Sequence, residues 1–246
     1  MPKSRKRKVP IRQKIAEKRK QKGHEVDFDI IRPFGPRIAR IQMPEEILGK
    51  MIELTDEIMK DEERKSWGHH LVGQIKEEPY ITNEQLQQIG VLDFFNGCLQ
   101  YYLKEVMKEL YTYTEENYLL ETGVKDMWSV HMEPGEYNPL HFHTFCHVSS
   151  VGYLKIPAHR PKRNIPHKED KDGMIEFVDH AAWPESLDRG TMVVEPTTGT
   201  MYMWPAQVLH TVYPFLGDQE RRSIAWNGVF RLTEKKTGNI IIGGNP

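Results

Sequence analysis

The chain has 246 residues, enough for one large domain or two small ones, and its 38% hydrophobic content with five Trp supports a real core. The net charge of −1 hides an asymmetry: residues 1–24 hold 11 of the 34 Lys and Arg and one acid, which leaves 23 basic and 34 acidic residues elsewhere. No apolar run approaches the ~18 residues of a membrane span, and two cysteines are too few for a disulfide scaffold, so we expect a soluble, cytoplasmic protein.

The basic residues 1–24 lack core side chains and repel one another, so we expect a disordered or transiently helical tail. Two interpretations of this tail stay open: an arm in weak contact with nucleic acid, and a solubilising extension. A basic run without interleaved aromatic residues does not decide between them. Residues 25–246 are expected to form a single domain.

The first elements of this domain are short strands followed by a helix. Residues 27–43 contain strand-like pieces that Pro33 and Pro36 confine to the edges of a sheet. From Pro44, which is tolerated in a first helical turn, apolar residues recur at helical spacing as far as Met59.

A second, longer helix is predicted next. Thr82 and Gln85 have the form of a capping box at its start, and an apolar stripe runs on to Leu110. We expect the helices of residues 44–112 to form a buttress that packs on one face of a sheet.

After about residue 125 the hydrophobic period falls to two, which is typical of strands. Pro and Gly turns separate seven or eight short strands, and this pattern predicts an antiparallel barrel or jelly roll with its core over residues 125–232. The fold class is therefore α+β, mainly β. The expected strands lie at 128–133, 140–156, 173–179, 191–195, 200–204, 208–213 and 221–230.

Three histidines are candidate metal ligands. His141 and His143 are two residues apart in a strand-like run, so their side chains leave an extended strand from the same face. His210 lies in another strand and shares its face with apolar neighbours, where a histidine without a partner would cost about 1–3 kcal/mol. A shared metal ion removes that cost, and neutral imidazoles suit Fe, Zn, Cu or Ni.

The strand after His210 carries a candidate carboxylate site. Arg221 and Ser223 share one face of it, and the fork of donors on an arginine matches a carboxylate. The alternative for Arg221 is a surface arginine paired with Glu220 or Asp218. Arg222 lies on the opposite face, and for it we prefer this surface interpretation.

Residues 126–230 carry a family resemblance. They resemble the 2-oxoglutarate/Fe(II)-dependent oxygenases of the double-stranded β-helix superfamily, in particular a group found in phage and bacteria. The segments that carry the resemblance, in order and with the spacing of that group, are HFHTFCHVSSVGYLKIP, GMIEFVD and PTTGTMYMWPAQVLHTVYPFLGDQERRSIAWN.

The resemblance implies a role for each of these residues. His141, His143 and His210 would bind Fe(II), and Arg221 with Ser223 would bind the distal carboxylate of the cosubstrate 2-oxoglutarate. Asn227 continues the face of Arg221 and Ser223, and Tyr153 or Tyr202 would offer the cosubstrate a phenol. The implied reaction hydroxylates an unknown substrate with O2 and releases succinate and CO2, in the host cytoplasm if the protein is phage-encoded.

One position departs from the family pattern, because most such enzymes use two histidines and one carboxylate. Here the second position is His143, and the carboxylate would have to come from Glu133, Glu136, Asp179 or Glu195. Two other functions stay open. The spacing from Gly135 to the histidine pair also resembles a cupin motif, which would give a metal enzyme that does not use 2-oxoglutarate. The other alternative is a non-catalytic barrel with a nucleic-acid-binding tail.

Overall fold

The computed structural model describes residues 19–21, 24–26, 35–110, 113–157, 161, 163, 165–179 and 190–243. The chain divides into two compact units, Met1–Gly35 and Pro36–Pro246. In the first unit, β1 (Arg19–Gln21) pairs antiparallel with β2 (His24–Val26). The rest of the expected tail lies outside the described residues, so its disorder and its contact with nucleic acid stay predictions.

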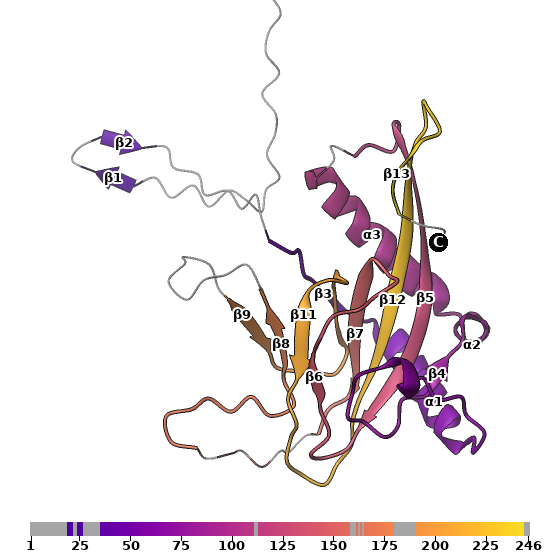
Figure 1. Cartoon of the computed structure of the whole chain (residues 1–246), viewed down its shortest axis with the longest axis vertical. Coiled ribbons are helices and arrows are strands. Elements are labelled where there is room, and N and C mark those ends of the chain that lie inside the picture. Colours follow the sequence, from indigo (N-terminus) through magenta and orange to yellow (C-terminus); the bar gives the residue numbers. More distant parts are fainter. Residues whose placement is uncertain are drawn as a thin grey trace, which may run out of the picture. The chain divides into compact units, whose positions relative to one another are not determined.

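The second unit is built on two antiparallel sheets (Figure 1). The order of the large sheet is β3-β10-β7-β12-β5-β4, with β13 also paired to β12, and the order of the small sheet is β6-β11-β8-β9. The strands are β3 (Ala39–Gln42), β4 (Tyr80–Ile81), β5 (Tyr118–Met132), β6 (Asn138–His141), β7 (Val148–Lys155), β8 (Ile175–Val178), β9 (Thr191–Val194), β10 (Thr200–Pro205), β11 (Leu209–Val212), β12 (Arg221–Glu234) and β13 (Ile240–Gly243).

The path of the chain identifies the fold. From β5 to β12 the chain passes from the large sheet to the small sheet and back, and only β8 and β9 follow each other within one sheet. The outcome is a jelly roll in which the first strand of the roll, β5, lies beside the last, β12. The predicted jelly roll is confirmed, although β5 begins at Tyr118, earlier than the change of period near residue 125 indicates.

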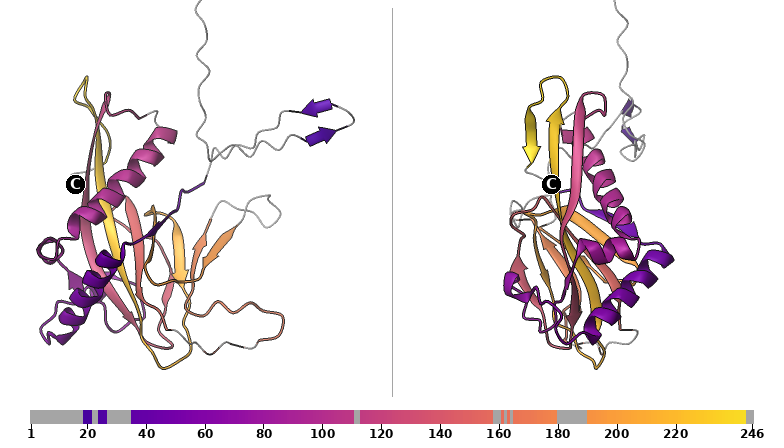
Figure 2. Two further views of the ribbon diagram at one scale, coloured as in Figure 1. Left: turned by 180° about the vertical axis from the view of Figure 1, so that it is seen from behind. Right: turned by 90° about the vertical axis from the view of Figure 1, so that its right-hand side faces the viewer.

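The α-helices of the described residues lie on one face of the large sheet (Figure 2). α1 (Glu45–Lys60) agrees with the predicted first helix, and β3 is an edge strand, as Pro33 and Pro36 shortly before it indicate. The predicted capping box is present, since Thr82 and Gln85 exchange both hydrogen bonds. The prediction of one long second helix is wrong.

That helix is interrupted at a glycine. α2 (Asn83–Gln88) ends before Gly90, whose φ of 71° is a left-handed conformation that a side chain disfavours, and α3 (Leu92–Leu110) begins after it. The apolar stripe continues across the break because Leu86 and Phe95 both reach the same core.

Two hydrophobic cores hold these layers together. One lies between the helices and the outer face of the large sheet, and includes Phe95, Leu99 and Trp226. The other lies between the two sheets, and includes Trp128, Trp204 and Phe177. Polar side chains enter only part of the second core, and the candidate site lies there. No helix among the described residues is long and apolar enough to cross a membrane.

Candidate functional site

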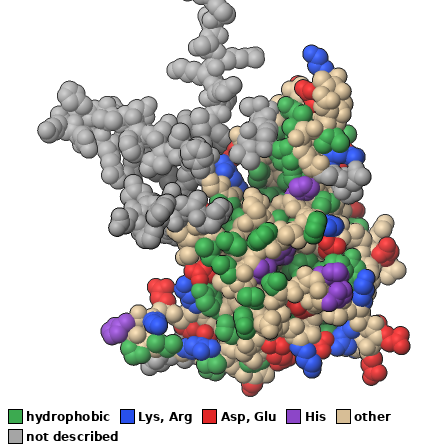
Figure 3. All heavy atoms as spheres, viewed as in Figure 1, with side chains coloured by type: hydrophobic (Ala, Val, Ile, Leu, Met, Phe, Trp, Pro, Cys, Tyr) green, Lys and Arg blue, Asp and Glu red, His purple; other side chains and the backbone are tan. Residues whose placement is uncertain are grey.

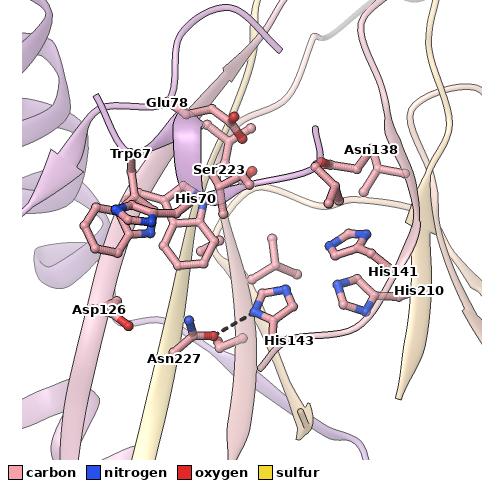
Figure 4. Close-up of a pocket in the computed structure, with 18 of the residues that line it drawn as sticks. Trp67, His70, Glu78, Asp126, Asn138, His141, His143, His210, Ser223 and Asn227 are labelled. Carbon is pink, nitrogen blue, oxygen red and sulfur yellow. Dashed lines mark hydrogen bonds between the residues drawn. The ribbon is translucent and has the colours of Figure 1, made fainter. Parts of the chain in front are cut away.

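The three candidate histidines converge between the sheets. His141 is the last residue of β6 and lies directly opposite His210 of β11, with 4.2 Å between the two ring centroids. His143 follows two residues after β6, and its ring centroid is 5.2 Å from that of His210. The potential ligand atoms of all three side chains lie within 4.8 Å of one another (Figure 4).

In each of the three histidines the same ring nitrogen, Nδ1, makes a hydrogen bond. Nδ1 of His141 lies 2.7 Å from the carbonyl oxygen of Pro139, and Nδ1 of His210 lies 3.0 Å from that of Val208. Nδ1 of His143 lies 2.7 Å from Oδ1 of Asn227. Since all three partners are oxygen acceptors, each Nδ1 carries the proton and each Nε2 keeps a lone pair for a metal ion.

The three imidazoles are also neutral. Burial lowers the pKa of His141, lowers that of His143 to about 4 and lowers that of His210 well below its usual value. Metal ions bind the neutral form of histidine, so no proton has to leave these rings at physiological pH before a metal ion binds.

The histidines line a cavity of about 430 Å³. Trp128, Val130 and Trp204 give it an apolar wall, and these side chains limit the access of water to the histidines. In the space-filling view, histidine side chains are visible in the middle of one face, surrounded by hydrophobic side chains (Figure 3).

Arg221 and Ser223 line the same cavity from β12. Both side chains are buried, and the guanidinium carbon of Arg221 lies 5.1 Å from the ring centroid of Tyr153. Burial raises the pKa of Tyr153 to about 12, so its ring supports Arg221 as a neutral phenol. Tyr153 therefore lies beneath Arg221 and is not among the residues that line the cavity.

Asn227 lies at the histidine end of the cavity, where its side chain orients His143 (Figure 4). Two other histidines lie away from the metal candidates. His147 accepts a hydrogen bond from the backbone of Phe230 at 3.2 Å, and His131 lies 2.6 Å from Glu220 on the outer face of the large sheet.

Arg222 was expected at the surface, and that expectation is wrong, although its predicted partner is right. Arg222 donates to Glu220 and to Asp56 of α1, yet only 5% of it is exposed. The alternation along β12 predicts that Arg222 lies opposite Arg221. It does not reveal that α1 covers that face.

No carboxylate joins the three histidines among the residues that the structure describes. The four candidates Glu133, Glu136, Asp179 and Glu195 are absent from the cavity lining. Two other acids, Glu78 and Asp126, do line the cavity, and sequence reasoning missed both. The period-two pattern would have placed Asp126 on the inner face with Trp128, whereas Glu78 precedes a strand of only two residues and leaves no such signal.

Comparison with known proteins gives a family-model match within the barrel. Residues 126–227 match the family model described as putative 2OG-Fe(II) oxygenase, where 2OG is 2-oxoglutarate. A search of curated proteins found no match.

Solved structures that resemble the chain include a Pseudomonas putida prolyl-4-hydroxylase, with 17% identity and a TM-score of 0.47, covering 77% of this chain and 91% of that one. Another is a Trichoplax adhaerens prolyl hydroxylase in complex with a hypoxia inducible factor peptide, with 10% identity and a TM-score of 0.49, covering 77% of this chain and 82% of that one.

Proposed function

We propose that this chain, whose residues 126–227 match the model of the putative 2OG-Fe(II) oxygenase family, binds Fe(II) through His141, His143 and His210 and hydroxylates its substrate in the cavity beside them. The cofactors are Fe(II) and 2-oxoglutarate, and the enzyme is a 2-oxoglutarate-dependent dioxygenase.

One observation carries the metal assignment: all three Nδ1 atoms are bonded to oxygen acceptors, while the rings cluster around one point. Metal-binding histidines usually donate their other N–H in this way, because the bond fixes the tautomer and the orientation of the ring. Three protein ligands leave further positions of an iron ion open to cosubstrate and O2.

Arg221 and Ser223 are the proposed partners of the distal carboxylate of 2-oxoglutarate. An arginine can donate two parallel hydrogen bonds to a carboxylate, and Ser223 adds a hydroxyl donor from the same strand face. The Tyr153 ring beneath Arg221 supports the guanidinium, and burial of both groups strengthens an ion pair formed there.

When bound, the iron supplies the oxidation that converts 2-oxoglutarate and O2 into succinate and CO2 and hydroxylates the substrate. The side chains of this chain provide position and environment. Asn227 holds the ring of His143, Arg221 fixes one end of the cosubstrate, and Trp128 with Trp204 excludes water from the reacting groups.

The experiment that tests this function measures succinate formed from 2-oxoglutarate with Fe(II) and O2. We expect the wild-type protein to form succinate, and Arg221→Ala to raise the KM for 2-oxoglutarate at least about thirtyfold, because a buried charged partner is lost. Arg231→Ala is the matched control, since Arg231 pairs with Glu121 at the far end of β12.

The same assay separates the two alternatives. A cupin-type enzyme would oxidise its substrate without 2-oxoglutarate and would be indifferent to Arg221→Ala. A non-catalytic barrel would take up no Fe(II), which metal analysis of the purified protein detects first.

Residues 1–24 would make weak, salt-dependent contacts with nucleic acid, because 11 of them are basic. The protein would work in the cytoplasm, where reducing conditions preserve ferrous iron and the free thiols of Cys98 and Cys146. Cell fractionation tests the location, and DNA binding at two salt concentrations tests the contact.

A further inference from the structure

Glu78 directs a carboxylate into the cavity from the edge of the large sheet. Glu77 lies opposite His131 and Tyr80 lies opposite Trp128, so the register places Glu78 opposite Val130, whose side chain points into the core between the sheets. Residues opposite each other in a sheet share a face, and Glu78 therefore points inward too. Figure 4 shows it on the side of the cavity away from His141 and His210.

The surroundings of this carboxylate are unfavourable for a charge. Only 3% of Glu78 is exposed, and its Oε2 has no hydrogen-bond partner among the described residues. Burial, with a smaller contribution from the nearby charge of Glu136, raises its pKa to about 7. A buried carboxylate without a partner is costly, and such groups persist in proteins mainly where function requires them.

The cations that line the cavity are engaged elsewhere. Nζ of Lys125 donates to the carbonyl oxygen of Phe145 at 2.9 Å and lies 3.8 Å from Asp126. Arg221 is assigned above to the cosubstrate. Among the described residues no other Lys or Arg lines the cavity, so we expect a cation that pairs with Glu78 to arrive with a ligand.

We propose that Glu78 binds a cationic group of the substrate, an ammonium or a guanidinium, and so selects cationic substrates for this oxygenase. This inference rests on the proposed function for the identification of the ligand as a substrate. The remaining surface near Glu78 suits such a ligand, because Trp67, His70 and Trp128 line the same cavity and would pack against the apolar part of a cationic molecule.

The test uses two matched probes, phenylguanidinium and phenylurea, which have similar shapes and differ in charge. Isothermal titration calorimetry at pH 8 measures their binding to the full-length protein before any metal is added. We expect the wild-type protein to bind phenylguanidinium at least about tenfold more tightly than phenylurea, since a charge-assisted pair forms with only one of them.

The variant Glu78→Gln keeps the size of the side chain and removes its charge, so it should bind phenylguanidinium and phenylurea about equally tightly. If this variant folds poorly, Glu78→Met, which is of similar length, takes its place. The control is Asp126→Asn, which removes the other carboxylate of the cavity and should leave the preference in place.

A wild-type protein that binds both probes equally overturns the proposal, and so does a Glu78→Gln protein that still prefers phenylguanidinium. The measurement needs neither iron nor turnover. A protein that prefers the cation but forms no succinate would contradict the proposed function and leave the cation site established.

Discussion

The Oδ1 atom of Asn227 accepts a hydrogen bond from Nδ1 of His143 at 2.7 Å, although the two residues are 84 positions apart in the sequence. β12 brings the amide to the ring, and the bond fixes which nitrogen of His143 faces the other two histidines. His141 and His210 receive the same support from backbone carbonyl groups. His143 is therefore the one member of the group whose orientation a side-chain substitution can change.

Replacing Asn227 by Leu should weaken Fe(II) binding about tenfold to a hundredfold without abolishing it, because such a substitution acts on the ligand indirectly. Titration of the metal-free protein under anaerobic conditions gives the affinity. Asn83→Leu is the control, since its amide bonds to the backbone of Val124 outside the cavity. An unchanged affinity in Asn227→Leu would show that the ring of His143 is held by other contacts.

Removal of a proposed iron ligand should weaken Fe(II) binding more than Asn227→Leu does. His141→Ala and His210→Ala should each lose stoichiometric Fe(II) while keeping the circular dichroism spectrum of the wild type, because the sheets are held by the surrounding apolar cores. His147→Ala serves as the control, since its ring bonds to the backbone of Phe230. Loss of the folded spectrum in both ligand variants would mark these histidines as structural instead.

Because all three proposed ligands are neutral histidines, the effect of the net charge of the site on Fe(II) binding can be tested by substitution. His143→Asp would restore the two-histidine, one-carboxylate set and lower the charge of the iron site from +2 to +1. We expect it to retain Fe(II) binding and to bind the ion more tightly than His143→Ala. The Asn227 amide then has to turn and present its NH2 group to the new carboxylate. An affinity no better than that of His143→Ala would indicate that Asp is too short to reach the site.

The ion pair of the buried Arg222 with Glu220 beneath α1 should stabilise the fold. Burial opposes the ionisation of Glu220, but hydrogen bonds from His131 and Arg222 outweigh it and lower its pKa to about 2. Arg222→Met leaves Glu220 without this partner, and we expect a loss of about 2–4 kcal/mol in the free energy of unfolding. Urea denaturation measures this loss.

Arg231→Met is the matched control for that measurement, because its pair with Glu121 is more exposed and should contribute much less. Equal effects of the two substitutions would contradict the role given to burial. Because the pKa of Glu220 is lowered, its contribution to stability is present above about pH 4.5 and is lost as the pH falls toward 2.

The raised pKa of Glu78 has the opposite effect on the pH dependence of stability. Its folded value of about 7 exceeds the ordinary 4.5, so the folded state holds the proton more tightly, and the protein loses stability as the pH rises from 4.5 through 7. Glu78→Gln does not titrate. Its free energy of unfolding relative to the wild type should therefore rise by about 2–3 kcal/mol between pH 5 and pH 8. A difference that does not change with pH would mean that Glu78 is ionised at both values.

The jelly roll could be predicted because the hydrophobic period falls to two after about residue 125 and Pro and Gly turns separate the short strands, and both signals are local. The convergence of the histidines was predictable from equally local patterns, since His141 and His143 are two residues apart in a strand-like run and His210 shares a strand face with the buried Val208 and Val212. Arg221 and Ser223 followed from alternation along one strand.

The features that could not be predicted depend on contacts between distant parts of the chain, which a local sequence pattern does not reveal. Gly90 interrupts a helix whose apolar stripe continues unbroken, so the stripe alone predicts one helix. Glu78 precedes a strand of two residues, which is too short to show a period. The burial of Arg222 depends on α1, more than 160 residues earlier, which covers its side of the sheet.

The last strand of the roll, β12, is also the middle of the large sheet, with β5 on one side and β7 on the other. A chain still being made on a ribosome therefore holds two halves of a sheet that have no common neighbour. Fourteen residues, Arg221–Glu234, then have to enter between them. Such non-local pairing slows folding and leaves strand edges open to aggregation in the meantime. The entry of β12 therefore brings Arg221 and Ser223, the proposed partners of 2-oxoglutarate, and Asn227, which orients His143, into the site in one late step. A chain that stops at residue 220 would carry the three histidines but would lack the centre of its sheet and the side chains proposed to bind the cosubstrate.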